Sequence, residues 1–157
     1  FTSTTEATHR LFLLLQTMGV SNIAEFSRNL PQFTRTRILD EFREGKLQMI
    51  ICSDAISRGI DLEEVSAVVC YDIPPFVKTY IHRVGRTARA GRSGKSFAIL
   101  RPEETSYFEK MRKKAGDLEK CKPVPVSSSD INALIPAFLE ALPKLKLRID
   151  QERFSSH

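Results

Sequence analysis

The stretch MIICSDAISRGID, Met49–Asp61, joins a continuously apolar segment to a polar loop. Met49–Cys52 lacks the alternation of a half-exposed strand, which predicts a strand buried on both faces, as in a parallel sheet. The same signal recurs at Val65–Tyr71 and, after a glycine-containing turn, at Phe97–Leu100. These three runs therefore predict a parallel sheet that is covered on both sides.

Helical patterns alternate with these strands. Thr4 or Thr5 can cap a first helix that Gly19 ends, and Pro31 opens a second helix that Gly45 ends. The apolar residues expected on their buried sides are Ala7, Leu11, Leu14, Leu15 and Met18 in the first, and Phe33, Ile38, Leu39 and Phe42 in the second. We further expect a strand at Ile23–Ser27 and the end of one at Phe1–Ser3.

This alternation of strands with helices implies βαβ units and an α/β fold with a doubly wound parallel sheet. Ligands of such folds bind beyond the carboxyl ends of the strands. The polar segment after Cys52 and the segment Asp72–Pro75 both follow strands, so we expect them to contribute to a binding site. Asp72–Pro75 also leads into an arginine-rich stretch.

The bulk composition describes an ordinary globular chain. Its 157 residues are 41% hydrophobic and 27% charged, and the net charge of +5 favours a polyanionic partner. Cys52, Cys70 and Cys121 form no CxxC pair, so we expect a reducing compartment without disulfides or zinc. No apolar stretch reaches membrane-spanning length. We expect the chain, which begins with Phe1, to be a fragment of a larger protein.

The composition divides the chain into a main domain at 1–121, a linker at 122–129 and a helical extension with a tail at 130–157. A helix expected at Glu103–Gly116 has a basic end, which suits the helix dipole better than it argues for RNA contact. Pro136 and Pro143 argue against a straight helix in the extension. Its apolar face should pack on the domain or on a neighbour, and it comprises Ile131, Leu134, Ile135, Phe138, Leu139 and Leu142.

The loop SDAISRGID, Ser53–Asp61, offers a hydroxyl, two carboxylates, an arginine and a glycine. A turn at Gly59 can present backbone N–H groups to phosphate, and Asp61 can accept hydrogen bonds from a ribose. The alternative is that Asp54 and Ser57 only cap a local turn.

In TYIHRVGRTARAGR, Thr79–Arg92, an arginine recurs every third residue. If the first part is helical, Arg86 and Arg89 are neighbours on one face and form a receptor for a phosphate-like oxyanion. A solvated basic face is the alternative, although Gly85 costs such a helix roughly 1 kcal/mol. A third segment, QFTR at Gln32–Arg35, opens the second helix, where phosphate would suit the helix N-terminus. A solvated helix start is the alternative for that segment.

These segments together resemble DEAD-box RNA helicases of superfamily 2. HRVGRTAR fits His-Arg-x-Gly-Arg-x-x-Arg, the last motif of that family, with Ala88 where many members have glycine. Ser53–Asp61 is similar to T-x-x-x-R-G-x-D, with Ser53 in place of threonine. Gln32–Arg35, Tyr71–Pro74 and the partial motif FTST at the chain start also match in family order, over residues 1 to 100.

The resemblance implies the second, C-terminal RecA-like domain of an ATP-dependent RNA helicase. Arg86 and Arg89 would act as arginine fingers on the γ-phosphate, and Asp61 would hold the ATP ribose. His82 and Asp54 would couple the two domains. The residues expected to grip RNA phosphates are Gln32, Arg35, Ser53, Arg58 and Gly59.

The resemblance also implies what lies elsewhere. No phosphate loop G-x-x-x-x-G-K-[ST] occurs in the chain, so ATP with Mg²⁺ would be bound mainly by a missing N-terminal RecA-like domain. We expect the partners to be that domain and RNA, single-stranded or a short duplex, and the fragment to be monomeric, without ATPase activity and not in a membrane. The forms of SRGID and HRVGRTARAGR resemble helicases of ribosome assembly, hence of the nucleus and nucleolus; the cytoplasm is the alternative.

Two other classes of function remain open at this point. One is a noncatalytic binding module that keeps the RecA-like fold as a platform for RNA or protein. A platform has no need of Asp61, Arg86 and Arg89 together, which argues against it. The other is a free-standing nucleotide or phosphate binder, which the absence of a phosphate loop disfavours.

Overall fold

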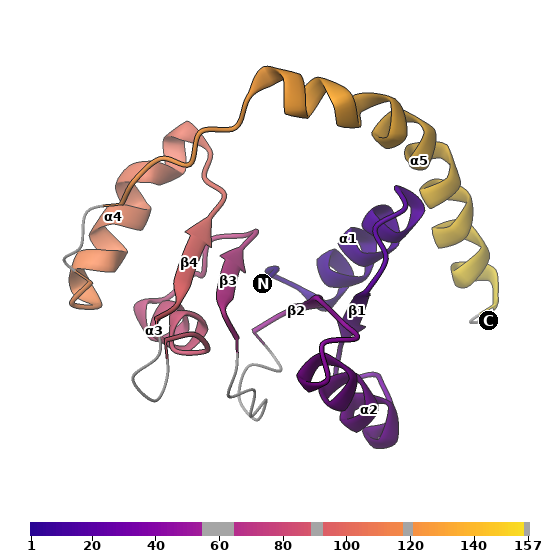
Figure 1. The fold of residues 1–157 in the computed structure, drawn as a ribbon, viewed down its shortest axis with the longest axis horizontal. Helices are drawn as coiled ribbons and strands as arrows, with labels where there is room; N and C mark the ends of the chain where they lie inside the picture. The colour runs from indigo at the N-terminus through magenta and orange to yellow at the C-terminus, as the bar shows by residue number, and fades with distance from the viewer. Residues whose placement is uncertain (55–64, 89–92, 118–120, 156–157) are drawn as a thin grey trace.

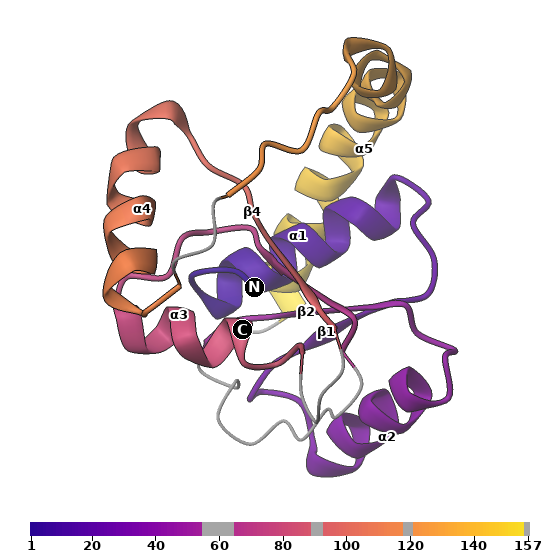
Figure 2. The same cartoon turned by 60° about the vertical axis from the view of Figure 1, so that its left-hand side comes forward.

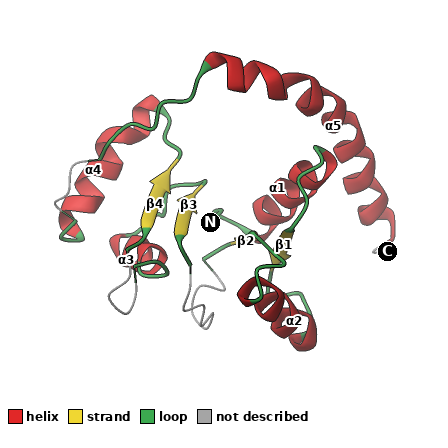
Figure 3. Cartoon of the chain, viewed as in Figure 1, coloured by secondary structure: helices red, strands yellow, loops and turns green. Residues whose placement is uncertain are grey.

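A computed structural model describes residues 1–54, 65–88, 93–117 and 121–155 (Figure 1). Helices and strands alternate along the chain, as Figure 3 shows by colour. The elements are α1 (Thr5–Thr17), β1 (Ile23–Phe26), α2 (Gln32–Arg43), β2 (Met49–Cys52), β3 (Ala67–Cys70), α3 (Val77–Val84), β4 (Lys95–Ala98), a short 3₁₀ helix (Pro102–Glu104), α4 (Thr105–Lys114) and α5 (Ser128–Ser155).

The strands form two parallel pairs that the first two residues of the chain connect. β1 pairs with β2 and β3 pairs with β4. Between them, the Thr2 amide donates to the Cys52 carbonyl at 3.0 Å and the Tyr71 amide donates to the Phe1 carbonyl at 2.9 Å. Thr2 also forms a parallel bridge with Ser53. The expected end of a first strand at Phe1–Ser3 is thus a short extended segment that makes one parallel layer of the two pairs.

Helices lie on both faces of the β1–β2 pair, which confirms the doubly wound α/β arrangement. α1 contacts β1 and β2, and its His9 reaches Glu25 on one face of β1. α2 buries Ile38 against Ala24 and Phe26 on the opposite face. Figure 2, turned by 60°, also separates α1 from α2. Successive residues of β1 point to opposite faces, so each helix covers its own set.

Local signals placed the first helix well. The Thr4 hydroxyl accepts a hydrogen bond from the Ala7 amide at 3.0 Å, so Thr4 is the N-cap of α1. Gly19 and Gly45 follow α1 and α2 with positive φ angles of 89° and 73°. Pro31 stands one position earlier than predicted, since it is the N-cap residue of α2 and Gln32 is the first helical residue.

The second half of the molecule has its own apolar core between α3, α4 and β4. Tyr80, Phe108 and Met111 are buried there, and the rings of Tyr80 and Phe108 meet edge-to-face with centroids 5.7 Å apart. Such an arrangement is favoured by the ring quadrupoles. This core fixes α3, the helix of the arginine-rich stretch, against α4.

The burial predictions were wrong at several positions. Met49 and Val69 are 45% and 44% exposed, so neither β2 nor β3 is covered on both faces along its full length. Phe33 lies on the exposed side of α2, and the most buried apolar residue of α1 is Leu13. The last strand begins at Lys95, two residues before the predicted start. The exposure of each of these side chains depends on which helices pack against the sheet, and a run of apolar residues in the sequence does not contain that information.

α5 is one continuous helix of 28 residues that contains both Pro136 and Pro143, and Figure 1 shows that it curves along its length, in keeping with the prediction that it is not straight. Its second half packs on α1, where Arg148 donates to Gln16 at 2.8 Å and Glu152 contacts His9 at 2.7 Å. Figure 1 shows its first half arching away from the strands. The predicted apolar face of that half is exposed, from 39% at Phe138 to 59% at Leu134 and Leu139. Among the described residues, no helix is long and apolar enough to cross a membrane.

Candidate functional site

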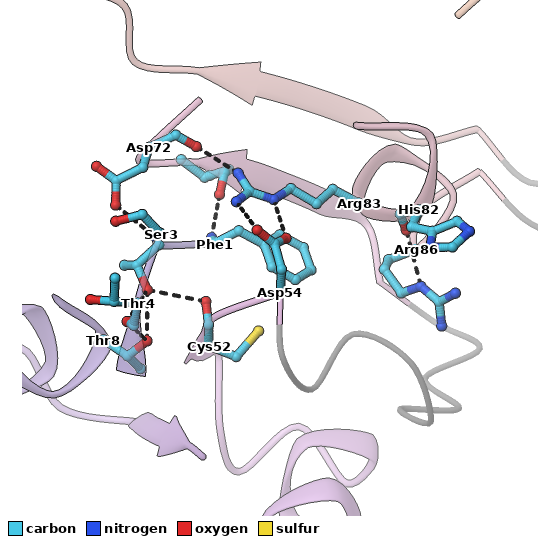
Figure 4. Close-up of polar contacts among 12 residues, drawn as sticks. Phe1, Ser3, Thr4, Thr8, Cys52, Asp54, Asp72, His82, Arg83 and Arg86 are labelled. Atoms are coloured by element: carbon cyan, nitrogen blue, oxygen red, sulfur yellow. Dashed lines mark hydrogen bonds and ion pairs between the residues drawn. The ribbon is translucent and has the colours of Figure 1, made fainter. Parts of the chain in front are cut away.

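A fully buried arginine connects the segments on which the predicted site depends. Arg83 of α3 has no exposed side-chain surface, and it donates from Nε and one terminal nitrogen to the two carboxylate oxygens of Asp54, each at 2.6 Å. Its other terminal nitrogen donates to the Asp72 carbonyl at 2.5 Å. Figure 4 shows these contacts at the centre of the site. Arg83 thereby joins α3 to the residues that follow β2 and β3.

The surroundings of Arg83 keep it charged. Burial by itself lowers its pKa, but the hydrogen bonds and the charge of Asp54 outweigh that effect and raise the pKa. The guanidinium carbon also lies 5.3 Å from the centre of the Phe1 ring, within range of a cation–π contact. Asp72 is held in turn, because its side chain accepts from the Ser3 amide at 2.7 Å. The ion pair is thus a fixed part of the domain.

The helix of the arginine motif ends earlier than the predicted geometry requires. α3 stops at Val84, and Gly85 is its C-cap residue, so Arg86 lies in the turn beyond the helix. The expected pairing of Arg86 and Arg89 on one helical face therefore does not apply at Arg86, and Arg89 lies outside the described residues. The Arg86 Nε donates to the His82 carbonyl at 3.2 Å. In Figure 4, Arg86 points away from the Arg83–Asp54 pair.

Thr87 and Gly94 hold the turn that carries Arg86. The Thr87 hydroxyl donates to the Val65 carbonyl at 2.6 Å, and the two residues form a parallel bridge. A Cβ on Gly94 would stand 2.1 Å from the Thr87 hydroxyl oxygen, so only glycine fits this approach. Ala88 has a left-handed φ of 55°, the conformation that a glycine adopts at no steric cost. The backbone of Ala88 is therefore strained.

The Arg86 turn lies at the amino ends of β3 and β4. Val65 and Thr87 pair just before these two strands begin, because α3 returns the chain antiparallel to β3. Asp54 and Asp72, by contrast, follow the carboxyl ends of β2 and β3. The site expected at the carboxyl ends of the strands thus corresponds to Asp54 and Asp72. Arg86 lies at the other end of the strands, and α3 connects it to those two residues.

The start of α2 is a second polar feature. Arg35 donates to the Gln32 side chain at 2.5 Å, while its Nε is buried and has no hydrogen-bond partner in the part of the chain that the structure describes. Pro31 supplies no side-chain cap to α2, and the first turn has no acidic residue. An anion would satisfy the open N-terminus of α2, whereas the buried Nε of Arg35 would meet one only if the side chain moved.

The remaining predicted residues differ in accessibility. His82 is half-buried on α3, whereas Ser53 is only 3% exposed, which makes it the least accessible of the described candidates. Arg58, Gly59 and Asp61 lie outside the described residues, as Arg89 does. Within the described ranges, no group of three His, Cys, Asp or Glu side chains is suited to a metal ion.

Sequence reasoning missed the structural role of Arg83 and a second buried arginine, Arg112. Arg83 shares the inward face of α3 with Tyr80, and a charged residue three positions from a buried aromatic signals a need for a partner. Arg112 belongs to the basic end that the sequence predicts for its helix. It is instead 5% exposed and forms ion pairs with Asp117 at 3.0 Å and Glu109 at 3.2 Å.

The cysteines near this site are buried. Cys52 and Cys70 are free and buried, and burial raises the pKa of the Cys52 thiol to about 11. A thiol that stays protonated at neutral pH is a poor nucleophile and metal ligand. Cys52 therefore acts as a small apolar side chain of the core.

Known proteins share both the sequence pattern and the fold. The model of the helicase conserved C-terminal domain matches residues 1–91. The chain is 42% identical to the human ATP-dependent RNA helicase DDX51 over 155 residues, which cover 98% of this chain and 23% of that protein. It is 43% identical to the rice DEAD-box ATP-dependent RNA helicase 1 over 154 residues, which cover 97% of this chain and 29% of that protein.

A solved relative supports the same conclusion at the level of the fold. The structure of Dbp5 of S. cerevisiae bound to RNA and ADP BeF3 matches with a TM-score of 0.70 and 29% identity, over 89% of this chain and 37% of that one. The chain thus spans about a quarter of the length of the two curated relatives. Its motifs, its parallel α/β fold and these similarities show that the chain belongs to the helicase conserved C-terminal domain family, as a RecA-like domain of the DEAD-box type.

Proposed function

We propose that this chain is the second RecA-like half of an ATP-dependent RNA helicase that completes an ATP site held mainly by another domain. The observation that carries the proposal is the buried Arg83–Asp54 ion pair, because it ties Asp54 to α3, and Arg86 lies in the turn just beyond that helix. Two motifs that must act on one nucleotide and one RNA strand are thereby held in a fixed relation. A platform without turnover needs no such coupling.

The chemistry of Arg86 fits a phosphate of ATP. Its guanidinium is a permanent cation, and the bond from Nε to the His82 carbonyl directs the side chain away from the Arg83 cluster. When bound, ATP supplies the phosphoanhydride bond that water cleaves. Arg86, together with Arg89, stabilises the negative charge that develops during that cleavage, a contribution of roughly 10³–10⁵ in rate for arginine fingers of GTPases.

The other nucleotide-side roles complete the proposal. Asp61 holds the ribose of ATP, and His82 and Asp54 transmit closure between the two domains. Mg²⁺ enters with ATP and is held mainly by the other domain. The chain alone should therefore lack ATPase activity.

The RNA-facing part of the proposal rests on the start of α2. The uncapped N-terminus of α2 and the positive charge of Arg35 in its first turn both favour a phosphate of the RNA backbone. Gln32, Ser53, Arg58 and Gly59 belong to the same RNA-contacting set, and Ser53 needs local opening to take part because it is buried. That Dbp5 was solved with RNA supports this assignment.

We also propose a cellular role for the protein, which rests on the exact sequences of its motifs. The versions SRGID and HRVGRTARAGR favour an RNA helicase of ribosome assembly in the nucleolus, acting through a monomeric domain on single strands or short duplexes. ATP and RNA would close the two domains on one another and bend one strand, which opens the duplex locally.

The test is ATP-dependent separation of a short RNA duplex by the intact protein. Arg86→Ala and Arg35→Ala should each lower the rate of strand separation at least tenfold, the first through ATP turnover and the second through RNA affinity. Arg43→Ala is the matched control, because Arg43 ends the same helix as Arg35 and pairs with Asp40 on an exposed surface. Full activity of both test variants would contradict the proposal.

A further inference from the structure

The position of α3 depends on a buried network outside the recognised motifs. The Tyr80 hydroxyl donates to one carboxylate oxygen of Asp117 at 2.6 Å. Arg112 of α4 donates to both oxygens of the same carboxylate, each at 3.0 Å. Tyr80 and Arg112 are 4% and 5% exposed, while the Asp117 side chain is 30% exposed, so the network is partly shielded from water.

The network holds one side of a short helix whose other side is held by the site. Tyr80 and Arg83 are three residues apart on α3, which has only eight residues. Arg83 binds Asp54 and Asp72 at the strand ends, whereas Tyr80 binds Asp117 beyond the end of α4. Two attachments on different supports fix both the axial position and the rotation of the helix.

Local geometry explains why Asp117 is available to Tyr80. Gly116 has a positive φ of 77°, which reverses the chain after α4, and the Asp117 amide donates back to the Arg112 carbonyl at 3.1 Å. Arg112 is further oriented by Glu109 at 3.2 Å. Burial and the adjacent Asp117 carboxylate raise the pKa of Tyr80, so its hydroxyl remains a donor over the neutral range.

We propose that Tyr80, Asp117 and Arg112 form a positioning clamp that sets the register of α3 and thereby the placement of Arg86 at the ATP phosphates. This inference rests on the proposed function of Arg86. None of the three residues needs to touch ATP or RNA. Their effect passes through α3, because Arg86 lies only two residues beyond Val84, the last residue of that helix.

The clamp predicts a specific kinetic signature in the intact protein. With ATP and single-stranded poly(U), Tyr80→Phe and Asp117→Asn should each lower the kcat of ATP hydrolysis about tenfold, the equivalent of one charge-assisted hydrogen bond. The KM for ATP should stay within about twofold, because most binding of ATP belongs to the other domain. Loss of overall folding would instead reduce both binding and turnover.

A matched control is provided by Tyr107→Phe. The Tyr107 hydroxyl also links α4 to the segment before α3, by donating to the Pro75 carbonyl at 2.7 Å, but this residue is half-exposed and outside the clamp. The kcat of the Tyr107→Phe variant should equal that of the wild type. Tyr80→Phe keeps the buried ring, so it remains informative even if Asp117→Asn proves unstable.

A double-mutant cycle separates the clamp from the proposed function. If the clamp acts through Arg86, Tyr80→Phe should lower kcat in the wild-type background and have no further effect in Arg86→Ala. Equal losses in both backgrounds, or no loss in either, would overturn the clamp. An Arg86→Ala protein with wild-type kcat would overturn the proposed function itself, a result that is distinct from a failure of the clamp alone.

Discussion

Arg83 has no exposed side-chain surface, and its charge is matched by a bidentate contact with Asp54. Removal of one partner from a buried pair leaves an uncompensated charge, which is more costly than the net value of the pair. We expect Arg83→Ala to lower the free energy of unfolding of this chain by about 3 kcal/mol. Urea-induced unfolding, followed by circular dichroism, measures the change.

An exposed arginine supplies the control for this experiment. Arg37 lies 3.8 Å from Glu41 on α2 with 64% of its side chain exposed, so Arg37→Ala should change stability by less than about 0.5 kcal/mol. Arg83→Lys should recover little of the loss, because an ammonium group cannot reproduce the two parallel bonds. Similar stabilities for Arg83→Ala and Arg37→Ala would show that the buried pair is not an anchor.

Ala88 offers a test of the opposite sign. Its φ of 55° costs an alanine roughly 1 kcal/mol, whereas glycine adopts this conformation freely. Ala88→Gly should therefore raise the melting temperature, while Ala133→Gly, in the exposed part of α5, should lower it. Thermal unfolding compares the two. A loss of stability in both variants would mean that Ala88 is not strained.

At the scale of elements, the joint between α3 and β4 depends on a close approach. Any Cβ at Gly94 would meet the Thr87 hydroxyl at 2.1 Å and the Ala88 amide nitrogen at 2.5 Å. Gly94→Ala should cost at least about 2 kcal/mol. Gly85→Ala should cost less, because the nearest atom to its added Cβ is the Ile81 carbonyl oxygen at 3.0 Å. The order of the two denaturation midpoints checks this assignment.

The contact between α1 and α5 should respond to pH. Burial opposes protonation of His9, but hydrogen bonds to Glu25 and Glu152 outweigh it and raise the pKa. A raised pKa in the folded state means that the stabilisation is complete below the unfolded pKa of about 6.5 and is lost as pH rises through the folded value. Because His9 is partly exposed, its contribution should stay under about 1 kcal/mol.

The measurement is the melting temperature of wild type and His9→Gln at pH 5.5, 7 and 8.5. The wild type should exceed the variant most at pH 5.5, and the difference should shrink with rising pH. Glu152→Gln should weaken the same trend, because it removes the negative charge on α5. A difference that does not change with pH would show that His9 is not charged in this contact.

The sequence predicted the helices and strands correctly where their limits are determined by neighbouring residues in the chain. Thr4 capping α1 and the glycines that end α1 and α2 are decided within a few residues, and these predictions were confirmed. The end of α3 and the exposure of Val69 depend on distant partners, so the periodic pattern gave no sign of them. The same holds for Arg112, whose burial depends on Asp117 and Glu109 rather than on its basic neighbours.

At the scale of the whole molecule, the residues predicted for the site lie on separate elements that Arg83 connects only in part. The family motifs predict Asp54, Arg35 and Arg86 as site residues, and the structure places the first beside Arg83 and the last in a turn beyond α3. Their roles toward ATP and RNA stay predictions.

The chain by itself should hydrolyse ATP no faster than a buffer control, with or without RNA, and a phosphate-release assay checks this. Steady turnover that Arg86→Ala abolishes would contradict it.

The most direct test of the central claim is the kcat of RNA-stimulated ATP hydrolysis by the intact protein, wild type beside Arg86→Ala and Arg89→Ala. If this domain completes the ATP site, kcat should fall by about 10³ in each variant while RNA affinity is retained. The exposed Arg37→Ala variant should keep wild-type activity. Wild-type turnover in both test variants would show that the ATP site is complete without these arginines and would contradict the account.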